Sequence, residues 1–133
     1  MRIVDGEKLV AFYLRERGFR VVGEPPSDRD SAWVKCQLIT TDNRTRPDYL
    51  VRYLIQADCY AGKDGGLPEA VTLALDVRAA LEELVGERDQ GTVTASRNVG
   101  QLRSPDASQA FEPARERVIL QQEVFAHPNR VAA

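Results

Sequence analysis

The chain has 133 residues, of which 43% are hydrophobic and 29% are charged, and its formal net charge is −2. These values are typical of a single globular domain, here residues 1–133, which can bury enough apolar surface to fold without a metal or a disulfide. The slightly negative charge excludes a global attraction to nucleic acid or to an anionic membrane, and no apolar run reaches the roughly 18 residues of a membrane-spanning helix.

The first third of the chain predicts a helix followed by strands. Asp5 can cap a helix that carries an apolar stripe and stops near Gly18. Residues 19–24 favour a short strand, and residues 32–40 alternate as a second strand. Residues 41–48 are rich in turn-forming side chains, so we expect them to connect two antiparallel strands.

A long strand is predicted at residues 49–61, where every second side chain is apolar or nearly so. This continuous face holds Val51, Tyr53, Ile55, Ala57, Cys59 and Ala61. The other face is mixed and holds Leu50, Arg52, Leu54, Gln56, Asp58 and Tyr60. Because it is half polar, this second face is either partly solvated or buried against something other than the chain's own core.

The second half predicts one more helix and two more strands. Pro68 suits a first helical turn, and apolar residues then recur at helical spacing until Gly86. Residues 91–104 and 115–128 have the composition of strands. The fold class expected from this order is α+β: a mostly antiparallel sheet of about four to five strands with two helices packed on one face.

Candidate chemical sites are weak. Neighbours along a strand point to opposite faces, so Asp58 and Cys59 do not form a paired site. Cys36 and Cys59 have the character of buried, reduced thiols, which fits a cytoplasmic protein. His127 is the single histidine, and no serine or cysteine motif accompanies it. The glycine-rich residues 60–66 lack the spacing of a phosphate loop. We therefore predict no catalytic residue, no cofactor and no metal site.

Basic residues gather between the predicted strands and helices, and two interpretations stay open. They are solvated loop residues, or they contact a partner, because the guanidinium group binds carboxylates well. Together with the mixed face of the long strand they form a set of interface candidates: Arg44, Arg46, Arg52, Gln56, Asp58, Arg97 and Arg103.

The segment YLVRYLIQADCYAGKDGGLPEAVTLALDVRAALEEL, residues 49–84, carries a resemblance to a known family. It is similar to the tail terminator (tail completion) proteins of long-tailed, lambda-like bacteriophages. That family shows a long strand with a Gln-x-Asp pair, a glycine break and an alanine-rich helix. Here the pair is Gln56 and Asp58, and the helix holds Ala70, Leu73, Ala74, Val77, Arg78, Ala80 and Leu81.

The resemblance implies a structural virion protein with no catalytic activity. Such proteins form a ring, typically a hexamer, on the head-proximal end of the tail tube. The ring stops tube polymerisation and joins the tail to the neck proteins of the head, and DNA passes through its lumen without sequence-specific binding. The expected partners are therefore other copies of the chain, the major tail tube protein and a neck or head-completion protein, with no membrane. The expected location is the tail–neck junction of the virion, after assembly in the host cytoplasm.

Two other functions remain open. One is another head–tail connector protein, either a stopper or an adaptor, which would bind the portal side instead of the tube. The other is a small α+β enzyme or ligand-binding module, which requires a concave pocket with converging polar groups.

Overall fold

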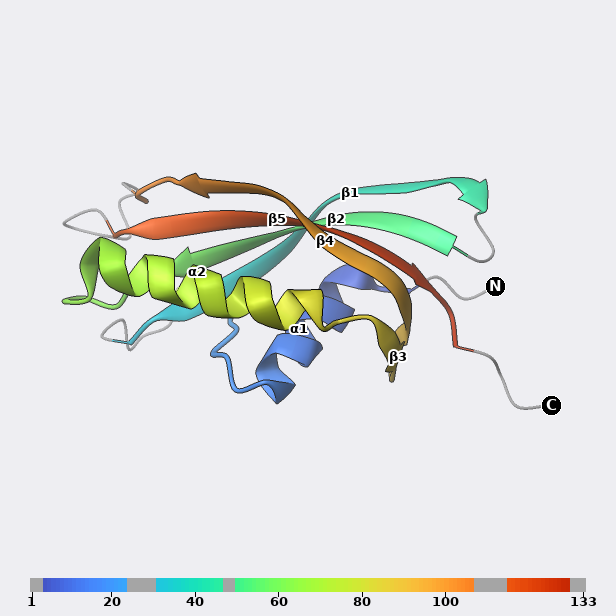
Figure 1. The fold of residues 1–133 in the computed structure, drawn as a ribbon, viewed down its shortest axis with the longest axis horizontal. Coiled ribbons are helices and arrows are strands. Elements are labelled where there is room, and N and C mark those ends of the chain that lie inside the picture. The colour runs from blue at the N-terminus through green and yellow to red at the C-terminus, as the bar shows by residue number, and fades with distance from the viewer. Residues whose placement is uncertain (1–3, 24–30, 47–49, 107–114, 130–133) are drawn as a thin grey trace.

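The computed structural model describes residues 4–23, 31–46, 50–106 and 115–129, with only the backbone described for residues 42–46. Within these residues it contains two helices and five strands (Figure 1). In chain order they are α1 (Gly6–Glu16), β1 (Trp33–Arg46), β2 (Leu50–Tyr60), α2 (Gly66–Glu82), β3 (Gly86–Arg88), β4 (Gly91–Arg103) and β5 (Arg117–His127).

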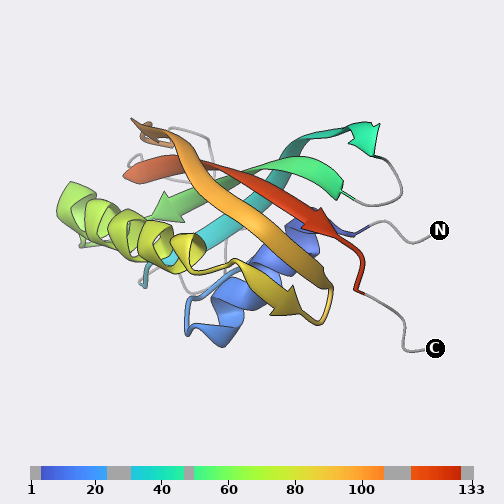
Figure 2. The ribbon, with the colours of Figure 1, turned by 45° about the vertical axis from the view of Figure 1, so that its right-hand side comes forward.

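The five strands form one sheet in the order β1-β2-β5-β4-β3, and every neighbouring pair is antiparallel. Both helices lie on the same side of this sheet (Figures 1 and 2). α1 packs on β1 and β2, and α2 packs on β2, β4 and β5. The predicted α+β fold, with an antiparallel sheet and two helices on one face, is confirmed.

The hydrophobic core lies between the helices and the sheet face that they cover, which we call the covered face. The predicted alternation of the long strand is confirmed, because its odd-numbered side chains are all buried on this face. β5 contributes its even-numbered side chains. The buried residues of the two strands are Val51, Tyr53, Ile55, Ala57 and Cys59 of β2 and Val118, Leu120, Gln122, Val124 and Ala126 of β5.

α1 begins at the predicted cap. The Asp5 carboxylate accepts a hydrogen bond from the Lys8 N–H at 3.0 Å, which satisfies one of the free amides at the helix start. The Tyr13 hydroxyl donates to the Ala80 carbonyl at 2.6 Å and so ties α1 to α2. Gly18 follows the helix with φ +93°, a conformation that side chains other than glycine rarely adopt.

α2 approaches the sheet closely because its buried face is mostly small. The Glu69 carboxylate accepts the Gly62 N–H and holds the preceding loop against the first turn. The predicted end of this helix at Gly86 is wrong, since the helix stops at Glu82 and Gly86 opens β3, a short strand that the sequence did not predict. The buried side chains of α2 are Ala70, Ala74, Val77, Ala80 and Leu81.

β1 is longer than predicted. Residues 41–48 were expected to form a connection, but β1 continues to Arg46 and its last residue pairs with Leu50. The register shifts between Asp42 and Arg46, so the turn-forming residues are accommodated as an irregularity within the strand pair. Pairing with the start of β2 therefore outweighs the local turn preference.

The predicted strand at residues 19–24 is not formed. Val21 makes a single parallel bridge to Val34, with the Val22 N–H donating to the Val34 carbonyl at 2.9 Å and the Val34 N–H donating to the Arg20 carbonyl at 2.8 Å. These bonds satisfy the outer edge of β1 at its start. The segment thus covers a sheet edge without adding a strand.

Candidate functional site: the open face of the sheet

The sheet face away from the helices carries the mixed side chains of the long strand, for which the sequence left contact with a partner open, and we call it the open face. Figure 1 shows no helix on this side of the sheet within the described residues. Alternation and strand register place the mixed side chains of β2 here, beside those of β5 and β4. The open face holds Leu50, Arg52, Leu54, Gln56, Asp58 and Tyr60 of β2, Arg117, Ile119, Gln121, Glu123, Phe125 and His127 of β5, and Arg97 and Leu102 of β4.

At the centre of the open face a carboxylate lies between two arginines. Glu123 of β5 accepts from Arg52 Nε of β2 at 2.5 Å and from Arg97 Nε of β4 at 2.8 Å. The Glu123 side chain is 8% exposed, whereas that of Arg97 is 73% exposed. The hydrogen bond from Arg52 is the main reason that the pKa of Glu123 lies below its usual range, and Arg97 adds to the effect. We call these three residues the arginine clamp.

Both arginines of the clamp donate a hydrogen bond to the Glu123 carboxylate through Nε. Within the described part of the chain their terminal Nη groups donate no hydrogen bond. The guanidinium fork is a strong donor to carboxylate and phosphate oxygens. The clamp therefore holds two guanidinium groups in place while leaving donors for an anionic partner.

Asp58 lies on the predicted face but is not available there, because it is only 2% exposed. Its two oxygens accept from Gln56 Nε2 at 2.8 Å and from Gln37 Nε2 at 3.4 Å. Burial raises the pKa of Asp58, and the bond from Gln56 opposes that rise in part. Asp58 is therefore almost inaccessible on this face, and Gln56, which is half-buried, is turned toward it.

The cysteine next to Asp58 points into the core, as predicted. Burial raises the pKa of the Cys59 thiol well above its usual range and that of Cys36 to about 12. A thiol is nucleophilic as the thiolate. Both cysteines are buried and uncharged at neutral pH, so the interpretation of them as structural residues is supported.

An aromatic pair closes one end of the open face, and the sequence did not indicate it. The rings of Trp33 and Tyr60 stack with centroids 4.7 Å apart and an interplanar angle of 10°. The Tyr60 hydroxyl donates to Asp106 at 2.9 Å and accepts from Arg117 Nη1 at 3.3 Å. Burial raises the pKa of Tyr60 to about 12. This cluster joins the start of β1 and the end of β2 to the segment that follows β4.

The remaining interface candidates are only partly placed. The side chains of Arg44 and Arg46 lie outside the described residues, although the backbone of both belongs to β1. Arg97 and Arg103 lie in β4, so the expectation that they occupy loops is wrong. Arg103 is exposed and pairs with Glu116 through bonds of 3.1 and 2.7 Å. Arg52 and Arg97 are thus the two candidates that the fold brings together.

Glu123, the residue that joins them, was not among the candidates. It is 71 residues from Arg52 and 26 from Arg97 along the chain. The alternation of β5 was the available signal, because the apolar residues Val118, Leu120 and Val124 share one parity and Ile119 and Phe125 share the other. Glu123 has the same parity as Ile119 and Phe125. Because β2 pairs with β5, Glu123 lies on the face that carries Arg52.

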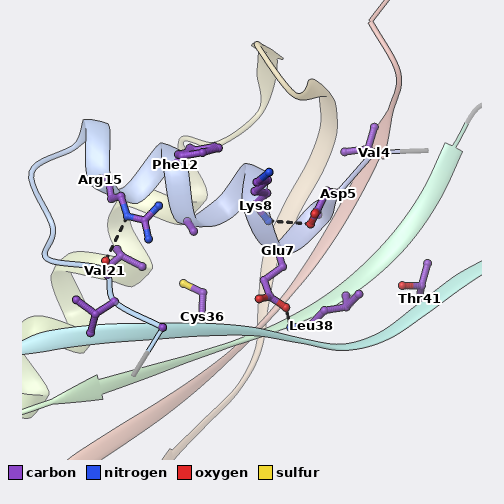
Figure 3. A pocket seen from close by; sticks show the side chains of 14 residues that line it. Val4, Asp5, Glu7, Lys8, Phe12, Arg15, Val21, Cys36, Leu38 and Thr41 are labelled. Atoms are coloured by element: carbon purple, nitrogen blue, oxygen red, sulfur yellow. Dashed lines mark hydrogen bonds between the residues drawn. The ribbon is translucent and has the colours of Figure 1, made fainter. Parts of the chain in front are cut away.

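A groove of ≈ 650 Å³ lies elsewhere, between α1 and the edge strand β1 (Figure 3). Two of its polar side chains bind the backbone: Glu7 accepts the Leu38 N–H at 2.9 Å, and Arg15 Nε donates to the Val21 carbonyl at 3.2 Å. In Figure 3, Cys36 lies at the base of this groove, and no hydrogen bond joins it to the other side chains drawn. These groups stabilise the helix on the sheet and do not converge on a common point, as a catalytic site requires.

The part of the chain that the structure describes contains neither a candidate metal site nor a membrane-spanning helix. No group of three or more His, Cys, Asp or Glu side chains there could hold a metal ion. The same residues include no helix long and apolar enough to cross a membrane. His127 Nδ1 lies 2.8 Å from the Pro128 carbonyl, a contact at the end of β5 and away from both cysteines.

Comparison with known proteins supplies no family for this chain. No family model matches it, and no curated protein matches it.

Proposed function

We propose that this protein is a tail terminator of a long-tailed bacteriophage, which forms a ring on the head-proximal end of the tail tube. The proposal rests on the resemblance carried by residues 49–84 and on a fold that agrees with it: one sheet, two helices on a single side and a second side that no described helix covers. In this function the protein ends tube polymerisation and joins the tail to the neck proteins. Its location is the tail–neck junction of the virion.

The observation that carries the proposal is the open face. It combines half-buried apolar side chains with the arginine clamp at its centre, and aromatic residues and arginine are enriched in protein interfaces. A stable interface needs roughly 800 Å² from each partner. The apolar members are Leu54, Ile119 and Phe125, with Leu102 exposed beside them.

The proposed activity is assembly and not catalysis. Three ionisable groups of the open face are engaged by neighbouring side chains: Glu123 by two arginines, Asp58 by two glutamines and Tyr60 by Asp106. A general base needs a pKa near neutrality and access to substrate. The two cysteines are buried thiols, which removes them as nucleophiles.

The test is co-assembly with the tail tube protein of the same phage. Purified protein added to polymerising tubes should appear in negative-stain images as rings or caps at one tube end, and tube length should stop increasing. The charge-removing variant Arg97→Ala should reduce the capped fraction, and Arg103→Ala, on the same strand but outside the clamp, is its matched control.

A failure to bind tube ends while tube protein is present would overturn the proposal. Pull-down against portal-side proteins then separates the alternatives, because a stopper or adaptor binds them and not the tube. A gene position between the neck genes and the major tail protein would support the terminator.

A further inference from the structure

Two charged patches lie on opposite sides of the molecule. The arginine clamp, on the open face, consists of two guanidinium groups and one carboxylate and so has net charge +1. On the helix side, the C-terminal end of α1 meets the β3–β4 turn around a depression of ≈ 120 Å³. Figure 2 shows this turn beside α1, below the sheet. We call this second site the acidic depression; its lining is Tyr13, Glu16, Glu87, Arg88, Asp89 and Gln90.

The acidic depression offers carboxylates that the fold does not use. Glu16, Glu87 and Asp89 are exposed, and their carboxylates form no hydrogen bond or ion pair within the described residues. Arg88 is directed inward: its guanidinium donates to the Leu84 carbonyl at 3.1 Å and the Glu83 carbonyl at 3.0 Å and stacks over the Tyr13 ring. The depression thus has three acids and one base, a net charge of −2.

We propose that the arginine clamp of one copy binds the acidic depression of a second copy of this chain. The unused Nη donors of Arg52 and Arg97 match the unused carboxylates of Glu16, Glu87 and Asp89. Contact between two clamps or between two depressions would place like charges together, which is unfavourable. This inference specifies the subunit contact of the proposed ring and therefore rests on that function.

The arrangement is head-to-tail. Because the two patches lie on opposite sides of the sheet, each copy that binds through its clamp still presents a free depression to the next copy. A heterologous contact of this kind generates closed rings where the rotation between subunits closes, and open filaments where it does not. A symmetric dimer would instead use one patch twice and end the assembly at two copies.

The test is charge reversal followed by mixing. Sedimentation velocity at low salt, about 50 mM, should show self-association of the wild-type protein, and raising the salt to about 500 mM should weaken it through screening. Arg97→Glu and the double variant Glu87→Arg/Asp89→Arg should each reduce the association constant about tenfold or more. An equimolar mixture of the two variants should associate again, since the reversed clamp of one variant matches the reversed depression of the other, and the unchanged depression of the first matches the unchanged clamp of the second.

Controls separate charge from folding. Arg103→Glu changes the same charge on the same strand but lies outside the clamp, so it should associate as the wild type does. Arg97→Gln removes the charge without introducing repulsion at Glu123, and it should give an intermediate loss. Circular dichroism melts should show that each variant is folded at the temperature of measurement.

Two outcomes would overturn the inference. One is a wild-type protein that stays monomeric at low salt up to about millimolar concentration, a range in which even weak specific contacts are detectable. The other is a mixture of the two folded reversal variants that does not associate more strongly than either alone. A protein that gave either result and still capped tubes would retain the proposed function and lose this subunit contact.

Discussion

The two faces of the sheet bury side chains by different means. On the covered face, β2 and β5 bury apolar residues against α1 and α2, and the driving force is the removal of that surface from water. On the open face no described helix assists, yet Glu123 and Asp58 are 6% and 2% exposed. Neighbouring side chains supply their hydrogen bonds: Glu123 accepts from arginines on the two adjacent strands, and Asp58 accepts from Gln56 on its own strand and from Gln37 on β1. Low exposure alone therefore does not distinguish the covered face from the open face. The two faces differ in what surrounds their buried side chains: apolar side chains on the covered face and hydrogen-bonding side chains on the open face.

The exception on the covered face supports this distinction. Gln122 is buried there among apolar residues; its Nε2 donates to Ser96 Oγ at 2.9 Å, and its Oε1 has no partner among the described residues. An unsatisfied buried acceptor costs free energy. The covered face tolerates one such atom because apolar packing dominates its energetics, while the buried carboxylates of the open face are each bonded.

The largest expected effect is loss of packing on the covered face. Leu120→Ala removes a side chain that is 0% exposed, and the free energy of unfolding should fall by about 2–5 kcal/mol, the usual range for such a cavity. Leu102→Ala on the open face, where the leucine is 62% exposed, should change it by less than about 0.5 kcal/mol. Urea unfolding measures both, and equal losses would contradict the distinction between the faces.

The second largest loss of stability is expected when the Glu123 carboxylate at the centre of the clamp is removed. Glu123→Gln keeps the shape but removes two charged hydrogen bonds, so unfolding at pH 7 should become easier by about 1.5–3 kcal/mol. Glu116→Gln, which breaks an exposed pair with Arg103, is the control and should lose much less.

The pH dependence of the same variant follows from the lowered pKa of Glu123. A folded-state pKa below the unfolded value gives stability that is complete above the unfolded pKa, about 4.3, and is lost as the pH falls through the folded pKa. The difference between wild type and Glu123→Gln should therefore shrink in acid. A difference that stays constant from pH 7 to pH 3 would show that the clamp carboxylate is not stabilised in its charged form.

Asp58 should behave in the opposite sense, with a smaller effect. Because its folded pKa is raised by burial, the charged form is disfavoured, and its contribution to stability should grow as the pH falls through the folded pKa toward the unfolded value of about 3.9. Asp58→Asn should leave stability at pH 7 unchanged or raise it by up to about 1 kcal/mol. A loss as large as that of Glu123→Gln would show that the two acids of the open face are equivalent.

The smallest expected effect concerns the two cysteines, whose thiols should not react in the folded protein. Cys36 and Cys59 are buried with raised pKa values, so a thiol reagent at pH 7.5 should label neither in the folded protein and both after unfolding. Mass spectrometry counts the labels. Rapid labelling of either residue under native conditions would place it outside the core.

Several local features were predictable because their causes are local. Asp5 caps α1 through a side chain three residues from its partner, and the alternation of β2 and β5 separates two faces whatever the sheet contains. From these the α+β class followed. The turn preference of residues 41–46 and the apolar run near Val21 misled the prediction, since pairing with β2 extended β1 and a single bridge replaced the expected strand.

The arginine clamp, in contrast, was not predictable from local sequence features. The sequence by itself determined which side chains share a face within each strand, because side-chain parity is a property of the extended backbone. It did not determine that β5 lies between β2 and β4, which is what brings Arg52, Glu123 and Arg97 within hydrogen-bond distance. Strand order depends on contacts between residues far apart in the chain, so only the tertiary structure decided which charges meet on the open face.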